Sequence, residues 1–282
     1  MAWNVKAVAK WMLVTFIIFI FGFFAVKPAK TQEVGSEAFN QSFQEYRSRI
    51  EEYEAAHDDY ELARSQYLKF NTLAARTNAQ EKTKTMLRAR NYVIISYLNL
   101  LKTRASENKG IESGDKDKIY TQADEEKGWF EDNNQKISEA SSLDDLVDLS
   151  GEARDKYNSL DPFKYKSLFT LTDGRINEYQ NRLNSIFVEI KEKVEIIKNE
   201  KREKYQFSDG KIDIIERWIN EAENRAEKSE ENQLLGREKA ERIINLGTYN
   251  TAINFLEDAR AYTKESTSYV KEIVREIKTA ED

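Results

Sequence analysis

The sequence contains no cysteine, two prolines and a single histidine among its 282 residues. Without cysteine there is no disulfide framework and no thiolate metal site, so packing has to stabilise the fold. Catalysis by a nucleophile and its base usually needs a histidine or a cysteine, and the glycines form no phosphate-cradling loop. We therefore expect neither an enzyme nor a cofactor.

Long apolar runs are also rare, and the longest uncharged one covers residues 11–26 (WMLVTFIIFIFGFFAV). As a helix it would reach about 24 Å, short of the roughly 30 Å hydrocarbon core of a bilayer. Lys10 and Lys27 can extend it by snorkelling, and Trp11 is an aromatic residue favoured at the lipid interface. The pattern predicts a single transmembrane signal anchor over residues 11–26, with these three residues at its interfaces.

A cleaved secretory signal peptide is the alternative, because it has the same basic start and apolar core. Its cleavage site needs small residues two places apart, but Phe23 precedes Ala25 and Lys27 precedes Ala29 at that spacing. We favour the uncleaved anchor, with residues 1–10 as a cytoplasmic tail and residues 27–35 as a tether. In either case the C-terminal domain is expected to be extracytoplasmic, and it would be secreted if the segment is cleaved.

The exported part is acidic. The first 30 residues hold four lysines and no acid, so the remaining 252 carry 40 bases against 50 acids, a net charge of −10. Nucleic-acid binding needs clustered lysine and arginine, so this charge argues against it, and also against docking flat on anionic lipid. The few prolines, together with a composition that is one third charged, favour long solvated helices.

A heptad stripe of tyrosines marks the first of these helices, predicted over residues 37–76. Tyr46, Tyr53, Tyr60 and Tyr67 recur every seven residues. Such spacing places them on one helix face, where each ring can be buried while its hydroxyl stays hydrated or bonded. We interpret the stripe as core, and the alternative is a row of tyrosines that binds a carbohydrate.

A second helix is predicted over residues 79–104. The junction near Thr77 and Asn78 would turn the chain into an antiparallel hairpin; the alternative is that the first helix continues through it. This long helical hairpin would occupy residues 36–107. A helical middle segment would follow over residues 115–172, in which Ser142 and Asp145 have the spacing of a capping box.

The C-terminal part, residues 173–282, is predicted to be a helical bundle. Apolar residues repeat every seven positions over residues 174–205, which favours one long helix there. Asp173 is predicted to cap its N-terminus, as Asp209 is for the next helix.

The C-terminal part carries the small residues Gly247, Ala252 and Ala259, with Tyr249 and Leu256 between them. Over about 25 residues this pattern resembles the second helix and the turn of a tetratricopeptide repeat. It departs from that family at Gly236, where a tryptophan is common, and at Lys264, where a proline usually closes the repeat. One long helix over residues 174–205 leaves no room for a preceding repeat, so we interpret the match as a tight αα-hairpin.

The sole histidine follows Glu54 at the Glu-x-x-His spacing of di-iron bundles. Those sites need a second such histidine, which this chain lacks. We therefore expect His57 to pack among the tyrosines and to bind no metal.

Together these patterns predict an all-α protein, with an N-terminal single transmembrane helix followed by an elongated antiparallel helical bundle, a coiled-coil-like ectodomain. A tail of about ten residues cannot carry a signalling module. The expected function is a membrane-anchored, non-catalytic scaffold or adaptor that contacts membrane lipid through residues 11–26 and binds another protein. An extracytoplasmic ligand-sensing or secreted domain that acts through a separate partner is the alternative.

Overall fold

The structure, a computed structural model, describes residues 36–199 and 209–279. The chain divides into two units, Met1–Ser36 and Glu37–Asp282. The predicted tail, anchor and tether fall in the first unit and lie outside the described residues. Apart from Ser36, every described residue belongs to the second unit.

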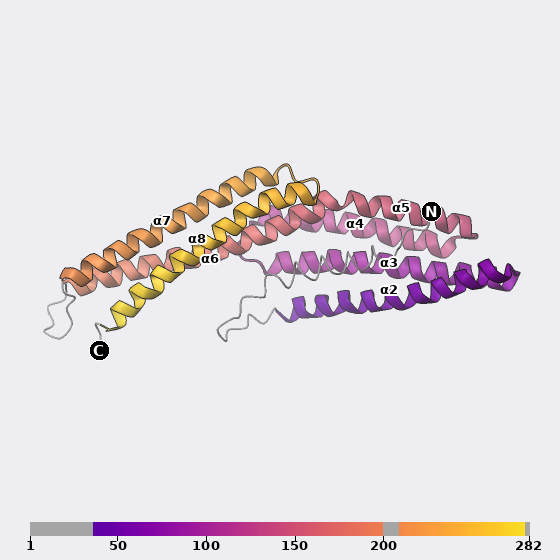
Figure 1. The fold of residues 1–282 in the computed structure, drawn as a ribbon, viewed down its shortest axis with the longest axis horizontal. Coiled ribbons are helices and arrows are strands. Elements are labelled where there is room, and N and C mark those ends of the chain that lie inside the picture. The colour runs from indigo at the N-terminus through magenta and orange to yellow at the C-terminus, as the bar shows by residue number, and fades with distance from the viewer. Residues whose placement is uncertain (1–35, 200–208, 280–282) are drawn as a thin grey trace. The chain divides into compact units, whose positions relative to one another are not determined.

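All regular structure in the described residues is α-helical, which confirms the predicted all-α class. Within residues 36–199, and again within residues 209–279, the helices follow one another with short connections (Figure 1). Their bounds are α2 Glu37–Phe70, α3 Leu73–Glu107, α4 Ser113–Glu139, α5 Leu143–Ser159, α6 Asp161–Asn199, α7 Asp209–Ala240 and α8 Leu246–Thr279.

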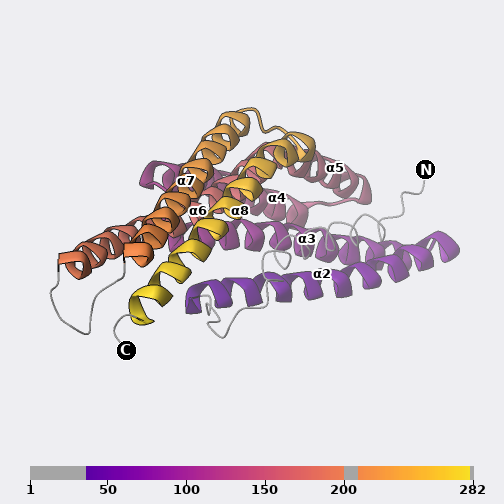
Figure 2. The same cartoon turned by 60° about the vertical axis from the view of Figure 1, so that its left-hand side comes forward.

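Two helical hairpins and a shared helix build the bundle. α2 packs antiparallel along α3, which packs in turn on α4, and α7 packs antiparallel along α8. α6 is the shared helix: its first residues contact α3, α4 and α5, and the rest of it lies beside α7 and α8 (Figures 1 and 2).

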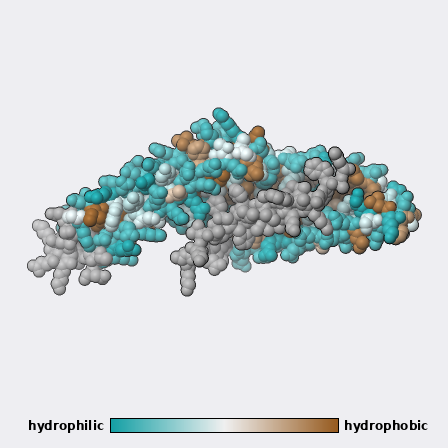
Figure 3. All heavy atoms as spheres, viewed as in Figure 1, coloured by the Kyte–Doolittle hydropathy of each residue, from teal (hydrophilic) through white to brown (hydrophobic). Residues whose placement is uncertain are grey.

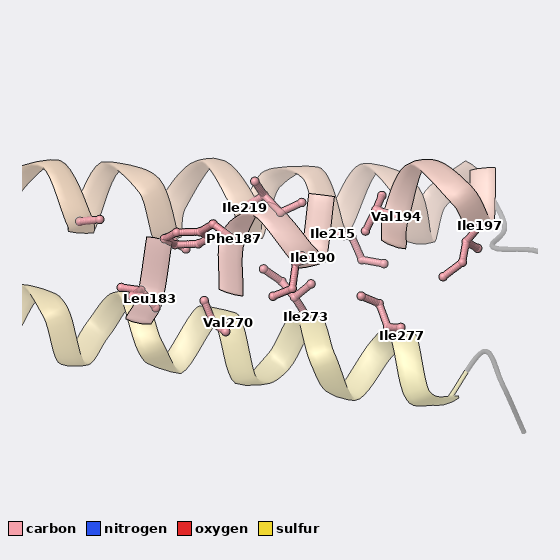
Figure 4. Packing of buried hydrophobic residues seen from close by; sticks show 12 residues of the cluster. Leu183, Phe187, Ile190, Val194, Ile197, Ile215, Ile219, Val270, Ile273 and Ile277 are labelled. Carbon is pink, nitrogen blue, oxygen red and sulfur yellow. The ribbon is translucent and has the colours of Figure 1, made fainter. Parts of the chain in front are cut away.

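Separate apolar clusters fill the interior along α6. Near its start, Leu160 and Phe163 pack with residues of α3, α4 and α5, including Leu98 and Phe130. Towards its end, apolar side chains of α6, α7 and α8 converge (Figure 4), where Ile190, Ile215 and Ile273 point toward one another. Burial of such side chains is the main favourable term in helix packing. Between these two clusters, Phe169 and Ile176 of α6 pack with Tyr249 and Leu256 of α8. One helix therefore takes part in three clusters.

The tight C-terminal hairpin is present. A Cβ atom on Gly236 would lie 3.2 Å from Leu256 Cδ2 and 3.3 Å from the Cβ of Phe255, so the glycine lets α7 approach α8 closely. The turn is closed by a reciprocal cap that the sequence analysis did not identify. Asn245 Oδ1 accepts from the Thr248 amide at 3.0 Å, and Thr248 Oγ1 accepts from the Asn245 amide at 3.1 Å.

Several predicted helix bounds were wrong. The first helix ends at Phe70 instead of residue 76, and the hairpin turns at Asn71 and Thr72 instead of Thr77 and Asn78. Asn71 takes a positive φ of 48°, which asparagine tolerates better than most residues, and Thr72 Oγ1 accepts from the Ala75 amide at 3.2 Å. The predicted second helix accordingly begins at Leu73 and runs on to Glu107.

The prediction that Asp173 caps a helix was also wrong, because α6 runs uninterrupted from Asp161 through this residue. The boundary expected between residues 172 and 173 therefore falls inside one helix. The capping box of α5 is confirmed: Ser142 Oγ accepts from the Asp145 amide at 3.1 Å, and Asp145 Oδ2 accepts from the Ser142 amide at 2.9 Å.

Among the described residues, no helix combines the length and the apolar character that crossing a bilayer requires. Residues 11–26, on which the anchor prediction rests, lie outside this range. The apolar stretch within α3 is buried in the bundle, with Ile94, Leu98 and Leu101 among its core residues.

Candidate interaction surfaces

The predicted interface anchors Lys10, Trp11 and Lys27 lie outside the described residues. The predicted tyrosine stripe is described in full on α2, and its four rings are half-buried. Tyr53 and Tyr60 pack against a cluster formed by α3, α4 and α5, which includes Leu87, Ile137 and Leu146. These two rings therefore face the rest of the bundle.

Tyr46, which lies nearer the N-terminus of α2 on the same stripe, packs against Tyr97 of α3 with the ring centroids 6.1 Å apart. Burial raises the pKa of both hydroxyls. Burial also raises the pKa of Tyr53, and the charge of nearby Arg90 opposes that rise. Each of these tyrosines therefore keeps its proton to a higher pH than a solvated tyrosine does.

Tyrosines also line the neighbouring part of the core, namely Tyr157, Tyr165 and Tyr249. The sequence analysis did not identify them as a group. Tyr165 of α6 and Tyr249 of α8 have ring centroids 5.3 Å apart. Burial raises the pKa of Tyr249 and raises the pKa of Tyr157 of α5 to about 12. Tyr97 and Tyr157 pack against the same apolar cluster, and Tyr165 packs against the neighbouring cluster that contains Tyr249. Their separations in the sequence follow no period, so only the tertiary fold could reveal the group.

A buried amide group joins α3 to α4. Asn91 Nδ2 donates to Asn133 Oδ1 at 2.8 Å and to Asn134 Oδ1 at 3.0 Å, and all three residues are buried. Buried amides bonded to one another fix the register of two packed helices more strictly than apolar contacts do. The arrangement is a structural tie between helices and provides no nucleophile or general base.

His57 is buried between the rings of Tyr53 and Tyr60, with centroid distances of 5.9 and 6.1 Å. One of its ring nitrogens lies within 4.8 Å of a carboxylate oxygen of Asp58 and of Glu61. All three residues come from adjacent turns of one helix, and both carboxylates are exposed. Surface acids on a solvated helix gather in this way without a metal, so we assign no function to the group.

A polar clasp ties α7 to α6, and ties α6 to the connection between α3 and α4. Arg237 Nε donates to Asp173 Oδ2 at 2.8 Å, and Gln233 Nε2 donates to Asp173 Oδ1 at 2.9 Å. Asn177, one turn further along α6, accepts from Arg237 and donates to the carbonyl of Gly110. Asp173 thus makes tertiary contacts in place of the helix cap predicted for it.

A shallow depression lies on the outer face of α4, lined by residues between Gly114 and Glu125. All the lining residues come from this one helix, so the depression is open to solvent. Binding of a small molecule usually depends on enclosure by several elements. This surface therefore offers little to hold a ligand.

Large apolar side chains are exposed where α7 turns into α8. Leu234 and Leu235 lie in the last turns of α7, and Ile244 and Leu246 lie in and just after the turn; Leu234 is 68 % exposed and Ile244 is 62 % exposed. We call these four residues the α7–α8 surface. Hydrophobic residues are visible near this turn in Figure 3. Exposed apolar groups on an otherwise charged bundle mark candidate contact sites.

Comparisons with protein-family models, with curated proteins and with solved structures give no match for this chain.

Proposed function

We propose that the protein is a non-catalytic adaptor whose helical bundle binds another protein through the α7–α8 surface. We further propose that residues 11–26 hold the bundle at a membrane, with the described domain on the extracytoplasmic side. The observation that carries the binding role is the exposure of Leu234, Leu235, Ile244 and Leu246 together at one turn.

The rigidity of this turn supports the proposal. Gly236 brings the backbones of α7 and α8 together, and the reciprocal cap between Asn245 and Thr248 fixes the start of α8. A surface that is already ordered loses less conformational entropy when it binds. The apolar side chains are also flanked by charges of both signs, including Arg237, Glu238 and Glu241, as in the polar rim of a protein interface.

The electrostatics of the interior favour a structural role. The buried groups with resolved shifts are mostly tyrosines, and burial moves the pKa of each further above neutrality. A general base or nucleophile works best when its pKa lies near the ambient pH. The interior of the bundle is thus better suited to holding helices together than to proton transfer.

Photo-crosslinking in intact cells tests the binding role. A photoreactive residue at position 244 is expected to give one discrete adduct, and the matched control is position 188, because Val188 is 58 % exposed on α6. The adduct partner should co-purify with the wild-type chain and be lost from a Leu234→Ser/Ile244→Ser variant. Equal labelling from positions 188 and 244 would contradict the assignment of this surface.

The membrane role has its own test. Alkaline carbonate washing is expected to leave the protein in the membrane pellet, since an integral helix resists extraction. A mature N-terminus near residue 26 or 30 would show that the segment is removed and would end the anchor proposal without affecting the binding surface.

A further inference from the structure

The end of the α2–α3 hairpin, residues 62–80, differs in character from the rest of the bundle. We call it the α2–α3 tip. Two residues, Asn71 and Thr72, connect helices of 34 and 35 residues, so the chain reverses at a narrow, protruding turn. The positive φ of Asn71 and the cap made by Thr72 define this turn. The tip is consequently an ordered, convex feature.

The tip extends beyond the other helices of the bundle. Gln80 Nε2 donates to the carbonyl of Ala140 at 3.4 Å, which marks where the α4–α5 connection meets α3. Past that contact, among residues 62–80, only Ala63 and Ala79 are buried. Two helices alone cannot enclose large side chains from both. Leu73 is therefore 80 % exposed, Leu68 64 % and Phe70 58 %.

The charge of the tip is opposite to that of the chain. Residues 62–80 contain Arg64, Lys69 and Arg76 and no aspartate or glutamate, whereas the whole chain has a net charge of −6. All three bases are exposed. Lys69 Nζ lies 5.1 Å from the ring centroid of Phe70, so its charge is held beside the exposed ring. The tip thus presents apolar side chains together with positive charge.

We propose that the α2–α3 tip docks onto an anionic phospholipid bilayer, with Phe70 and Leu73 entering the boundary between headgroups and acyl chains and the three bases contacting lipid phosphates. Apolar side chains combined with lysine and arginine bind anionic bilayers by both burial and electrostatic attraction. The negative charge of the whole domain still argues against docking flat, because only the tip is basic. A narrow contact at the tip avoids that repulsion.

The chemistry of the tip favours lipid over a protein partner. A convex turn has no groove into which a partner's side chain could insert, and a bilayer needs no shape complementarity. The α7–α8 surface provides the contrast, since residues 234–246 carry two glutamates beside three bases. The proposal does not depend on residues 11–26. At 1.5 Å per residue, α2 alone places the tip about 51 Å from the first residue of α2. A chain anchored at its N-terminus could in this way contact a second membrane.

Vesicle flotation tests the proposal with the full chain. The protein is reconstituted into nanodiscs of neutral phosphatidylcholine, which accommodate residues 11–26 and leave both faces accessible. It is then mixed with phosphatidylcholine vesicles that contain or lack phosphatidylglycerol. We expect the nanodisc-bound protein to float with the anionic vesicles and not with the neutral ones, and to dissociate at high salt because screening weakens the attraction.

Variants identify the docking residues. Lys69→Gln/Arg76→Gln should weaken vesicle binding about 30-fold, the loss expected from two bases near an anionic surface. Phe70→Ser/Leu73→Ser should weaken it at least about tenfold. The controls Leu234→Ser/Ile244→Ser and Lys109→Gln/Arg242→Gln should bind as the wild type does. All the changed side chains are exposed, so circular dichroism and the melting temperature should stay unchanged.

Each contrary result overturns the proposal in its own way. Binding that survives both tip variants would place the lipid contact elsewhere. No flotation with anionic vesicles would exclude lipid, and a change of oligomeric state in the tip variants would make a second copy of the chain the occupant. A chain that fails to enter nanodiscs would refute the anchor; the same flotation with the free protein would then test the tip separately.

Discussion

Among the described glycines, Gly110 has the least room for a side chain, because it packs against the backbone of α6 at Gly174. A Cβ atom on Gly110 would sit 1.8 Å from the carbonyl oxygen of Gly174 and 2.7 Å from the amide of Glu178. Both are backbone atoms of α6, so a side chain cannot be relieved by a change of rotamer. Gly110 has no positive φ, and its requirement is therefore for space alone.

We predict that Gly110→Ala destabilises the protein by about 3 kcal/mol, at the upper end of the usual cost of overpacking. At about 2–4 °C per kcal/mol for a chain of this size, the melting temperature should fall by about 6–12 °C. Gly128→Ala in α4 is the matched control, because its Cβ would meet nothing within 4 Å. There the better helix propensity of alanine should keep or slightly raise the melting temperature. Similar melting curves for the two variants would contradict this contact.

The buried tyrosines predict how stability changes with alkaline pH. A tyrosine in the unfolded chain titrates near pH 10.0, whereas burial raises the pKa of Tyr157 in the folded protein to about 12. The folded state holds this proton more tightly. The resulting stability is present in full below pH 10 and is lost as the pH rises through about 12.

Denaturant unfolding at a series of pH values checks this expectation. We predict that the free energy of unfolding falls steadily above about pH 10 and that tyrosinate absorbance appears together with unfolding. Tyr157→Phe should make the fall shallower, because it removes one contributing group. A free energy that is independent of pH between 10 and 12 would contradict the burial of these hydroxyls.

At the scale of elements, the heptad stripe on α2 is placed where it can stabilise the hairpin on the bundle. Tyr53 packs with Leu87 of α3, Ile137 of α4 and Leu146 of α5 in one cluster. We predict that Tyr53→Ala costs about 2 kcal/mol, less than the 3–5 kcal/mol of a fully buried aromatic because this ring is half-buried. Leu62→Ala on the same helix, 59 % exposed, should cost less than about 0.5 kcal/mol. Thermal melts compare the two, and an unchanged Tyr53→Ala melt would favour a binding role for the stripe.

The helices themselves could be predicted from the sequence because each carries an apolar repeat, but their ends could not always be located. Ser142 and Asp145 marked the start of α5 correctly, since the capping box is a local signal. The turn at Asn71 and Thr72 has neither glycine nor proline, and one threonine cap gives a weak signal. Asp173 misled the prediction for a related reason. An aspartate before a glycine resembles a cap, whereas here Gln233 and Arg237, 60 and 64 residues away, provide its partners.

The candidate surfaces were less predictable than the helices. The sequence contains Leu73, Leu234 and Ile244 among many similar residues, and nothing local distinguishes them from core positions. Their exposure depends on where neighbouring helices end, which is a tertiary property. The absence of acids in residues 62–80 was available in the sequence. It indicates a contact surface only when the fold shows that those residues form one protruding turn.

For the whole molecule, α6 is the element on which both parts of the bundle depend. Its first residues share a core with α3, α4 and α5, and its later residues share another with α7 and α8. A third cluster lies between these cores, where Phe169 and Ile176 of α6 pack with Tyr249 and Leu256 of α8. The clasp at Asp173 lies in the same part of α6 and joins it to α7, while Asn177 joins α6 to the α3–α4 connection. Two cores linked in this way can open separately, as cooperative units of different stability do in other proteins.

Asp173→Ala tests this organisation. The change removes one of two acceptors of Arg237 and one acceptor of buried Gln233, each of which still reaches Asn177 Oδ1. The expected cost is about 2 kcal/mol, within the usual range for hydrogen bonds to a charged group. If the two parts open separately, hydrogen exchange should become about 30-fold faster in α7 and α8 and stay unchanged around Ile94 and Leu98 of α3. Asp258→Ala, at an exposed position of α8, should leave both unchanged. Uniform acceleration across α3 and α8 would instead show that the bundle opens as one unit, with α6 transmitting the loss of the clasp to both cores.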